Sequence, residues 1–139
     1  MYTPSFRLRS FDVIPYGMKR GVLMHLLEAL TMADVAYLLA EPHTPKLYEA
    51  GVRYEEEPSG RDEWQDIPDT IARRTGDCED LACWRVAELR VRGGQPNAGH
   101  DVTVSEIPDR SGSIVTTFHI RVLHEDGRVE DPSRLLGMK

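Results

Sequence analysis

Residues 76–94 read GDCEDLACWRVAELRVRGG, and this stretch decides how the rest of the chain is interpreted. Apolar residues recur within it at helical spacing, and Gly93 with Gly94 follows the last of them. Asp77 is a favourable N-cap, and Asp80 three residues later makes an aspartate variant of the capping box. The pattern predicts a helix over 78–92.

Cys78 lies in the first turn of this predicted helix, on its apolar stripe. Unpaired N–H groups and the helix dipole favour a thiolate there, and a thiolate is the nucleophile that acyl transfer needs. A buried cysteine is also often just a small apolar residue, and Cys83, in mid-helix, fits that interpretation. Their spacing places the two cysteines on different faces, so we expect two free thiols in a reducing compartment.

A nucleophilic thiol also needs a base, and His119 is the histidine that falls inside a predicted strand. In TTFHIRV, residues 116–122, alternation places His119 and Arg121 on one face and the apolar side chains on the other. A strand histidine alone is more often a surface or hydrogen-bonded residue. Its role therefore depends on its neighbours.

Asp131 is the candidate that would orient this histidine, and the length of the turn before it decides whether the two side chains lie on the same face. If residues 125–127 form a three-residue loop with Gly127 in the left-handed position, Asp131 lies diagonally beside His119, roughly 7 Å away between Cα atoms. A two-residue loop would turn Asp131 to the opposite face. The sequence leaves both registers open, and Asp131 could instead end the strand or pair with Arg121.

Upstream of the cysteine, Gln65 or Trp64 could supply an oxyanion donor beside the Cys78 backbone N–H, although a tryptophan packed over the core is the simpler interpretation. Metal binding is not expected, because no CxxC or HExxH spacing occurs. Glu79 and Asp80, which could be combined with His119 or His124 as ligands, are explained by the helix start. No nucleotide cofactor is expected either.

The remaining patterns predict an α+β fold in which helices pack against an antiparallel sheet formed mainly by the C-terminal strands. We expect one domain over 1–139, with an N-terminal part over 1–60 and a core over 61–139. The predicted elements are a strand over 5–14, one long helix or two short ones over 18–39, a helix over 67–74, an exposed loop over 54–61, and strands over 101–107, 113–123 and 128–131.

Composition narrows the function classes. The chain has 139 residues, 40% hydrophobic and 29% charged, which is typical of a soluble globular protein. A net charge of −6 with scattered basic residues argues against nucleic acid as a partner. The apolar run over 21–40 is interrupted by polar residues, so no membrane span is expected, and the first ten residues do not resemble a secretory signal. A cytoplasmic or virion-associated location follows.

GDCED, FHIRV and EDPS together resemble the core of the transglutaminase-like cysteine peptidase superfamily, over residues 64–138. WQDIP at 64–68 is similar to the tryptophan-containing segment before the cysteine in bacterial members. The resemblance implies a papain-like fold with Cys78 as nucleophile, His119 as base and Asp131 as its aspartate. The interval from His119 to Asp131 is shorter than in many relatives, and Ile120 replaces the usual aromatic or small residue.

The implied activity is a thiol protease or amidase that cleaves a peptide or isopeptide through a thioester. The implied substrate is a peptide or protein, with peptidoglycan peptides among the options, and no cofactor is implied. A transglutaminase that passes the acyl group to an amine is one alternative. A structural or adaptor protein in a phage tail or assembly complex is another, since the compact chain is similar to versions encoded in phage gene clusters.

Overall fold

The computed structural model describes residues 3–5, 8–57 and 63–139. It has a mixed α+β fold with an antiparallel sheet, as predicted. Along the chain the elements are η1 (Arg9–Val13), α1 (Tyr16–Ala40), η2 (Leu47–Glu49), β1 (Arg53–Tyr54), α2 (Ile67–Arg73), β2 (Thr75–Gly76), α3 (Cys78–Arg92), β3 (Gly99–Pro108), β4 (Ile114–Leu123), β5 (Val129–Glu130) and α4 (Pro132–Leu135).

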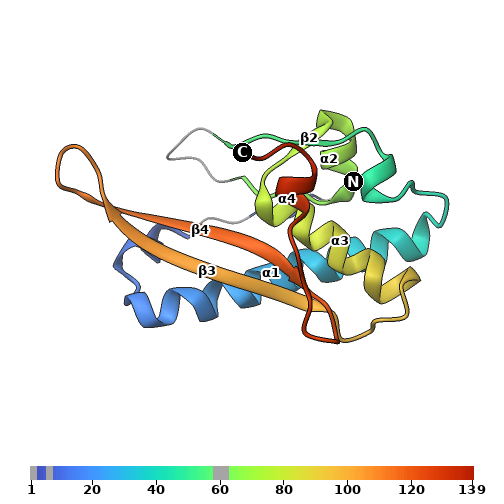
Figure 1. Ribbon diagram of the computed structural model, residues 1–139, viewed down its shortest axis with the longest axis horizontal. Helices are drawn as coiled ribbons and strands as arrows, with labels where there is room; N and C mark the ends of the chain where they lie inside the picture. Colours follow the sequence, from blue (N-terminus) through green and yellow to red (C-terminus); the bar gives the residue numbers. More distant parts are fainter. Residues whose placement is uncertain (1–2, 6–7, 58–62) are drawn as a thin grey trace.

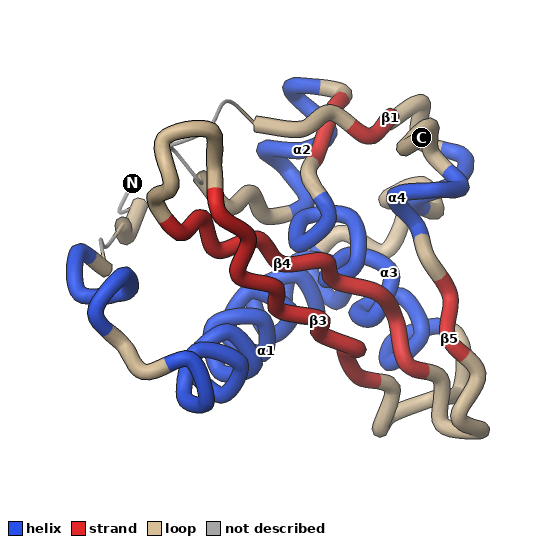
Figure 2. Tube along the Cα trace, turned by 60° about the vertical axis from the view of Figure 1, so that its left-hand side comes forward, coloured by secondary structure: helices blue, strands red, loops and turns tan. Residues whose placement is uncertain are grey.

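Helix α3 is the centre of the fold, because two hydrophobic clusters share it. On one side Cys78, Ala82 and Val86 pack with α1 and with the inner face of the sheet β3-β4-β5. On another side Leu81 and Trp84 pack with α2, η2 and the end of α1. Figure 2 shows α1 and α3 on the same side of the sheet, and Figure 1 shows the hairpin of β3 and β4 projecting beyond the helices.

The start of α3 is fixed by the predicted capping box. The side chain of Asp77 caps the first turn, and the carboxylate of Asp80 accepts a hydrogen bond of 2.9 Å from the Asp77 backbone N–H. Helix α2 begins in the same way, with Asp66 accepting from Asp69 N–H at 3.2 Å. These caps satisfy N–H groups that a helix start otherwise leaves without partners.

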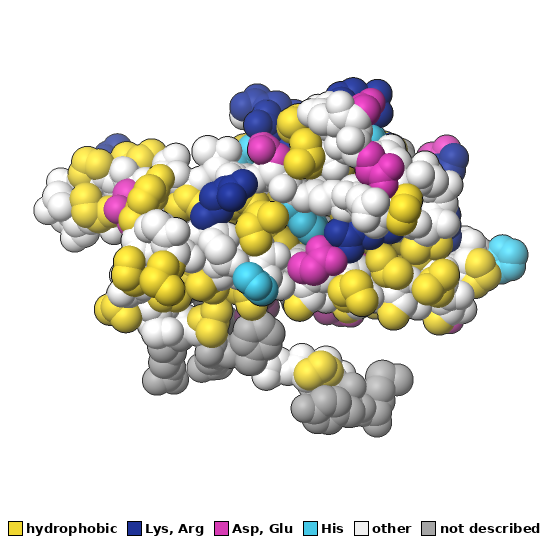
Figure 3. Space-filling view, turned by 90° about the horizontal axis from the view of Figure 1, so that it is seen from below, with side chains coloured by type: hydrophobic (Ala, Val, Ile, Leu, Met, Phe, Trp, Pro, Cys, Tyr) yellow, Lys and Arg dark blue, Asp and Glu magenta, His cyan; other side chains and the backbone are white. Residues whose placement is uncertain are grey.

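Helix α1 shows that the helical segment predicted near the N-terminus is one long helix and not two short ones, and its buried face includes Leu23, Leu27 and Leu38. By length and composition alone it would suffice to cross a membrane, contrary to the sequence expectation, but one face of it is packed in the core. Figure 3 views the molecule from below and shows hydrophobic side chains interspersed with charged ones on the surface of that side of the molecule.

The predicted strand over 5–14 is wrong. Residues 6–7 lie outside the described part, and the rest includes the 3-10 helix η1. Side chains of α1 occupy the outer edge of β3 at Val102 and Val104, where a further strand would pair. The Tyr16 hydroxyl donates to the Val104 carbonyl at 2.8 Å, and Arg20 Nε donates to the Val102 carbonyl at 3.3 Å. Alternation alone could not reveal this competition.

The short elements also differ from the sequence expectations. Strands β1 and β2 form a small parallel pair that the sequence analysis missed, and β1 lies at the start of the loop predicted over 54–61, of which residues 58–62 are outside the described part. Helix α4 follows Asp131 directly and was also missed. Two-residue strands and a single helical turn carry too few residues to show a periodicity.

The turn between β4 and β5 has the three-residue form. Val122 pairs with Glu130 and Leu123 with Val129, while the His124 N–H donates to the Arg128 carbonyl at 2.9 Å. Gly127 has a φ of 89°, the left-handed conformation that this loop requires. The register is therefore the one that brings Asp131 to the face of His119.

Replacing Gly127 with alanine should lower the free energy of unfolding by about 1 kcal/mol, because a Cβ is strained at positive φ. Gly99→Ala is the matched control, since Gly99 has no left-handed φ and nothing within 4 Å of an added Cβ. Urea unfolding followed by circular dichroism measures both. Equal stability of the two variants would contradict the assigned loop geometry.

Candidate functional site

The His119 ring and the Asp131 carboxylate form a hydrogen-bonded pair. Nε2 of His119 lies 2.8 Å from Oδ2 of Asp131, and the two side chains are 27% and 16% exposed. Asp131 is held in turn as the N-cap of α4, where it accepts from the Arg134 N–H at 3.3 Å. The pair therefore has a fixed orientation and is reachable from solvent. Nδ1 is the ring nitrogen that this bond leaves for other chemistry.

The Cys78 sulfur lies against the edge of β4, next to the main chain of His119. The thiol is 4.0 Å from the carbonyl oxygen of Phe118, and the sulfur accepts a hydrogen bond from the Ile120 N–H. These are the backbone groups on either side of His119. Among the described residues, the hydrogen-bond partners of the sulfur do not include the His119 ring.

Glu79 is the neighbour of the sulfur that the sequence analysis did not assign to the site. Its side chain is fully buried, and its Oε2 accepts from the Cys78 thiol at 3.4 Å. Burial of Cys78, which is 5% exposed, and the nearby carboxylates of Glu79 and Asp77 raise the pKa of the Cys78 thiol. This corrects the expectation that the helix start favours a thiolate, because desolvation and negative charge outweigh the helix dipole.

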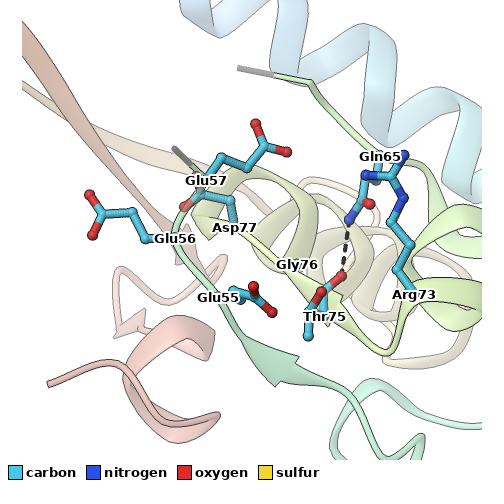
Figure 4. Close-up of a pocket in the computed structure, with 8 residues that line it drawn as sticks. All are labelled: Glu55, Glu56, Glu57, Gln65, Arg73, Thr75, Gly76 and Asp77. Carbon is cyan, nitrogen blue, oxygen red and sulfur yellow. Dashed lines mark hydrogen bonds between the residues drawn. The ribbon is translucent and has the colours of Figure 1, made fainter. Parts of the chain in front are cut away.

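The expected oxyanion donors are bonded elsewhere. The Gln65 side-chain amide donates to the Thr75 carbonyl at 3.0 Å and to Asp80 Oδ2 at 3.1 Å, and Figure 4 shows it turned toward Thr75. The Cys78 N–H donates to Asp77 Oδ1 at 2.7 Å. Trp64 packs on the core, with its ring edge-on to Phe118 at 6.4 Å between centroids. The structure thus leaves neither Gln65 nor the Cys78 N–H directed at a reacting carbonyl.

A small hollow of about 170 Å³ adjoins the start of α3. Glu55, Glu56, Glu57 and Asp77 line it together with one basic residue, Arg73, so its charge is predominantly negative. Figure 4 shows these side chains around the segment that leads into the helix.

Asp77, Cys78 and Glu79 each offer a possible metal-ligand atom, all within 4.8 Å of one another. Hydrogen bonds at the helix start already use these groups, as described above. His124, one of the histidines considered with Glu79 and Asp80, bonds Glu130 at 2.8 Å near the hairpin turn. Capping and hydrogen bonding thus account for the carboxylates that the sequence analysis weighed as ligands.

Two further carboxylates, Asp34 and Asp80, are buried near the cysteine helix. Asp34 accepts from the Ile67 N–H at 2.9 Å, and Asp80 accepts from the Gln65 N–H at 2.7 Å. Burial raises the pKa of Asp80 to about 7 and raises that of Asp34 as well. Asp34 thus joins the first residue of α2 to α1, and Asp80 joins the loop before α2 to α3. Asp80 was expected as a cap, whereas no sequence signal marked Asp34.

Cys83 has a histidine neighbour that the sequence analysis missed. His100 Nε2 lies 2.8 Å from the Thr31 hydroxyl and 3.8 Å from the Cys83 sulfur, inside the core. Cys83 is fully buried, and burial raises its thiol pKa and lowers the pKa of His100 to about 4. A substrate could not reach this sulfur, so the pair is a structural one.

His100 should make the stability depend on pH. The folded protein keeps its imidazole neutral, whereas the unfolded chain protonates it below about pH 6.5. Acid therefore favours unfolding through this group from about pH 6.5 down to about 4, at a cost of at most about 3 kcal/mol. His100→Gln should remove this dependence in urea unfolding over that pH range.

The effect of His100→Gln is the difference in unfolding free energy between the variant and the parent at each pH. This difference is needed because Asp80 makes the stability depend on pH in the opposite direction to His100. The raised pKa of Asp80 adds stability at low pH that is lost as the pH rises from about 4 to about 7. Asp80→Asn is the matched control and should make the acid destabilisation steeper. An unchanged pH slope in His100→Gln would show that the His100 pKa is not lowered in the fold.

Comparison of the chain with protein-family models, with curated protein sequences and with solved structures finds no match.

Proposed function

We propose that the protein is a thiol hydrolase that cleaves a peptide or isopeptide amide, with Cys78 as nucleophile, His119 as general base and Asp131 as the residue that orients His119. One observation carries the proposal. His119 is bonded to Asp131 at 2.8 Å on the strand whose adjacent backbone groups bind the Cys78 sulfur. The start of α3 supplies the sulfur, and the hairpin of β4 and β5, about forty residues later in the chain, supplies the other two groups.

The resting thiol is neutral, so the reaction begins with a proton transfer. Asp131 holds Nε2 of His119, which leaves Nδ1 to take the proton of Cys78. The sulfur then attacks the amide carbonyl carbon, and the carbonyl π electrons move to the oxygen. Asp131 stabilises the imidazolium that forms, through the short hydrogen bond to the ring.

The second half of the reaction returns the proton. His119 protonates the leaving amine as the C–N bond breaks, and a thioester remains on Cys78. Water attacks this thioester with His119 again as base, which releases the acid and restores the thiol. An amine in place of water would give a transglutaminase reaction at the same residues.

The arrangement also supports the proposed family and fold. A cysteine at a helix start, a histidine on a following strand and an aspartate at the end of the next strand occur here in the order that the transglutaminase-like resemblance implies. Helix α3 packs against the strand that carries the histidine. We propose on this basis that the fold is a compact papain-like one, and that peptidoglycan peptides and protein isopeptides are the substrate classes to test.

A second candidate function has its own support. The Cys78 side chain is buried, Glu79 accepts a hydrogen bond from its thiol, and the expected oxyanion donors are bonded elsewhere. A structural or adaptor protein that retains the fold without activity would have these properties. The two candidates differ in whether His119 governs the reactivity of Cys78.

Alkylation by iodoacetamide, located by mass spectrometry of peptides, tests this dependence. Cys78 should react faster than Cys83, which is fully buried. His119→Ala should slow the reaction of Cys78 by at least about tenfold near pH 7, because the base that removes its proton is lost. Asp131→Asn should slow it in the same direction.

His43→Ala is the matched control, since His43 is exposed and far from Cys78 in the sequence, and it should leave the rate unchanged. Acylation provides the second readout. With p-nitrophenyl acetate the acetyl group should appear on Cys78 in the parent and be lost in time to water or to an added amine. Equal alkylation rates in the parent and His119→Ala, with no acetyl-enzyme, would instead support the structural protein.

A further inference from the structure

We propose that the free edge of β4 from Ile114 to Thr116 binds an extended peptide by strand addition, next to the Cys78 sulfur. The identity of this peptide as the substrate rests on the proposed function. The binding itself rests on the sheet. Three observations carry it: the direction of the backbone groups, the contacts along the edge, and the composition of the strand.

The direction of the backbone groups follows from the hairpin. In a β-strand, alternate residues direct their N–H and C=O groups to opposite edges. His124 directs its N–H to β5, while Phe118 and Ile120 direct their backbone groups to Cys78. All three are even-numbered, so Ile114 and Thr116 direct their N–H and C=O groups to the same edge, away from β3.

This edge of β4 is occupied over part of its length. Strand β5 pairs with it at Val122 and Leu123, and the start of α3 covers it at Phe118 and Ile120. Within the described part of the chain, no hydrogen bond on this edge reaches the backbone groups of Ile114 or Thr116. Two pairs of donors and acceptors therefore remain for a ligand, in line with the sulfur.

The opposite edge of the sheet, formed by β3, differs from the free edge of β4. Along β3, the carbonyls of Val102 and Val104 point outward, and side chains from α1 donate to both. The fold thus covers one exposed edge with side-chain donors. Along β4 at Ile114 and Thr116, the described residues provide no comparable donors.

The composition of the free edge suits a peptide. Native proteins usually protect an exposed edge strand with charged residues, proline or a bulge. The segment 114–117 is Ile-Val-Thr-Thr, with neither charge nor proline, and β4 pairs with β3 there without interruption. Ile114 is 62% exposed and Val115 is 43% exposed. Figure 1 shows this part of the hairpin extending past the helices.

The strand spacing gives the length of the ligand. Residues 114 to 118 span about 13 Å at about 3.3 Å per residue, so a peptide of about four residues reaches from Ile114 to the sulfur. Main-chain hydrogen bonds would provide affinity with little dependence on peptide sequence. The inferred substrate is therefore an extended, unbranched stretch of polypeptide rather than a compact folded surface.

Two tetra-alanine probes test the inference, one with a chloroacetyl group at its amino end and one with a chloromethyl ketone at its carboxyl end. The comparison reagent is chloroacetamide, and every rate is normalised to the reaction of the same reagent with glutathione. At least one probe should alkylate Cys78 about tenfold faster than chloroacetamide does. N-methylation of alternate amides should abolish the acceleration, because it removes the donors of the added strand.

The variant Ile114→Pro removes an N–H that points to the free edge and leaves the ladder bonds to β3 intact. It should lose the acceleration, whereas Ile114→Ala, which keeps the N–H, should retain it. Position 114 is preferred over Thr116 because the Thr116 hydroxyl accepts a hydrogen bond from Lys19 at 3.0 Å. Circular dichroism and thermal unfolding establish that both variants fold.

The outcomes separate this inference from the proposed function. Acceleration that persists in His119→Ala supports edge binding even if the catalytic assignment fails. Equal rates for Ile114→Pro and Ile114→Ala, or for methylated and unmethylated probes, overturn edge binding whatever His119 does. A second copy of the chain could bind the same edge, and sedimentation velocity tests this alternative. If Ile114→Pro converts a dimer to a monomer without changing the probe rates, the edge binds a second copy and the inference is wrong.

Discussion

The position of the candidate nucleophile depends on one buried carboxylate, that of Asp80. It accepts hydrogen bonds from the backbone N–H groups of Gln65 and Asp77 and from the Gln65 side-chain amide. These bonds join the segment before α2 to the first turn of α3. Desolvation makes a buried carboxylate costly, and several donors compensate that cost. The helix start, and with it the sulfur of Cys78, is fixed at the edge of β4 as a result.

The hairpin of β4 and β5 provides the second constraint. Together with α3 it shows which features of the site can be predicted from the sequence. The capping residues and apolar period of residues 77–92 suffice to predict α3, because the caps and the period are both local signals that can be found in the sequence. For the hairpin, the sequence allowed two strand registers, and only one of them places Asp131 beside His119. Local residue preferences favoured neither register strongly enough, and the pairing of Val122 with Glu130 and of Leu123 with Val129 in the folded chain distinguishes them.

Other features could not be predicted, because they depend on tertiary contacts. The alternating segment near the N-terminus has the pattern of a strand, but α1 side chains occupy the edge where it would pair. The ionisation of Cys78 was predicted from the helix start alone, whereas burial and Glu79 determine it in the folded protein. The Thr31, Cys83 and His100 cluster joins three elements, and no local motif indicates it. In each case a distant part of the chain supplies the deciding group.

The burial of Cys78 has a consequence for how the protein persists in a cell. Peroxide oxidises thiolates that solvent can reach, and the product is a sulfenic acid that can be oxidised further without return. A sulfur that is 5% exposed and keeps its proton presents neither property. The Glu79 carboxylate, which helps to raise the pKa of the Cys78 thiol, therefore also protects this sulfur from oxidation by peroxide.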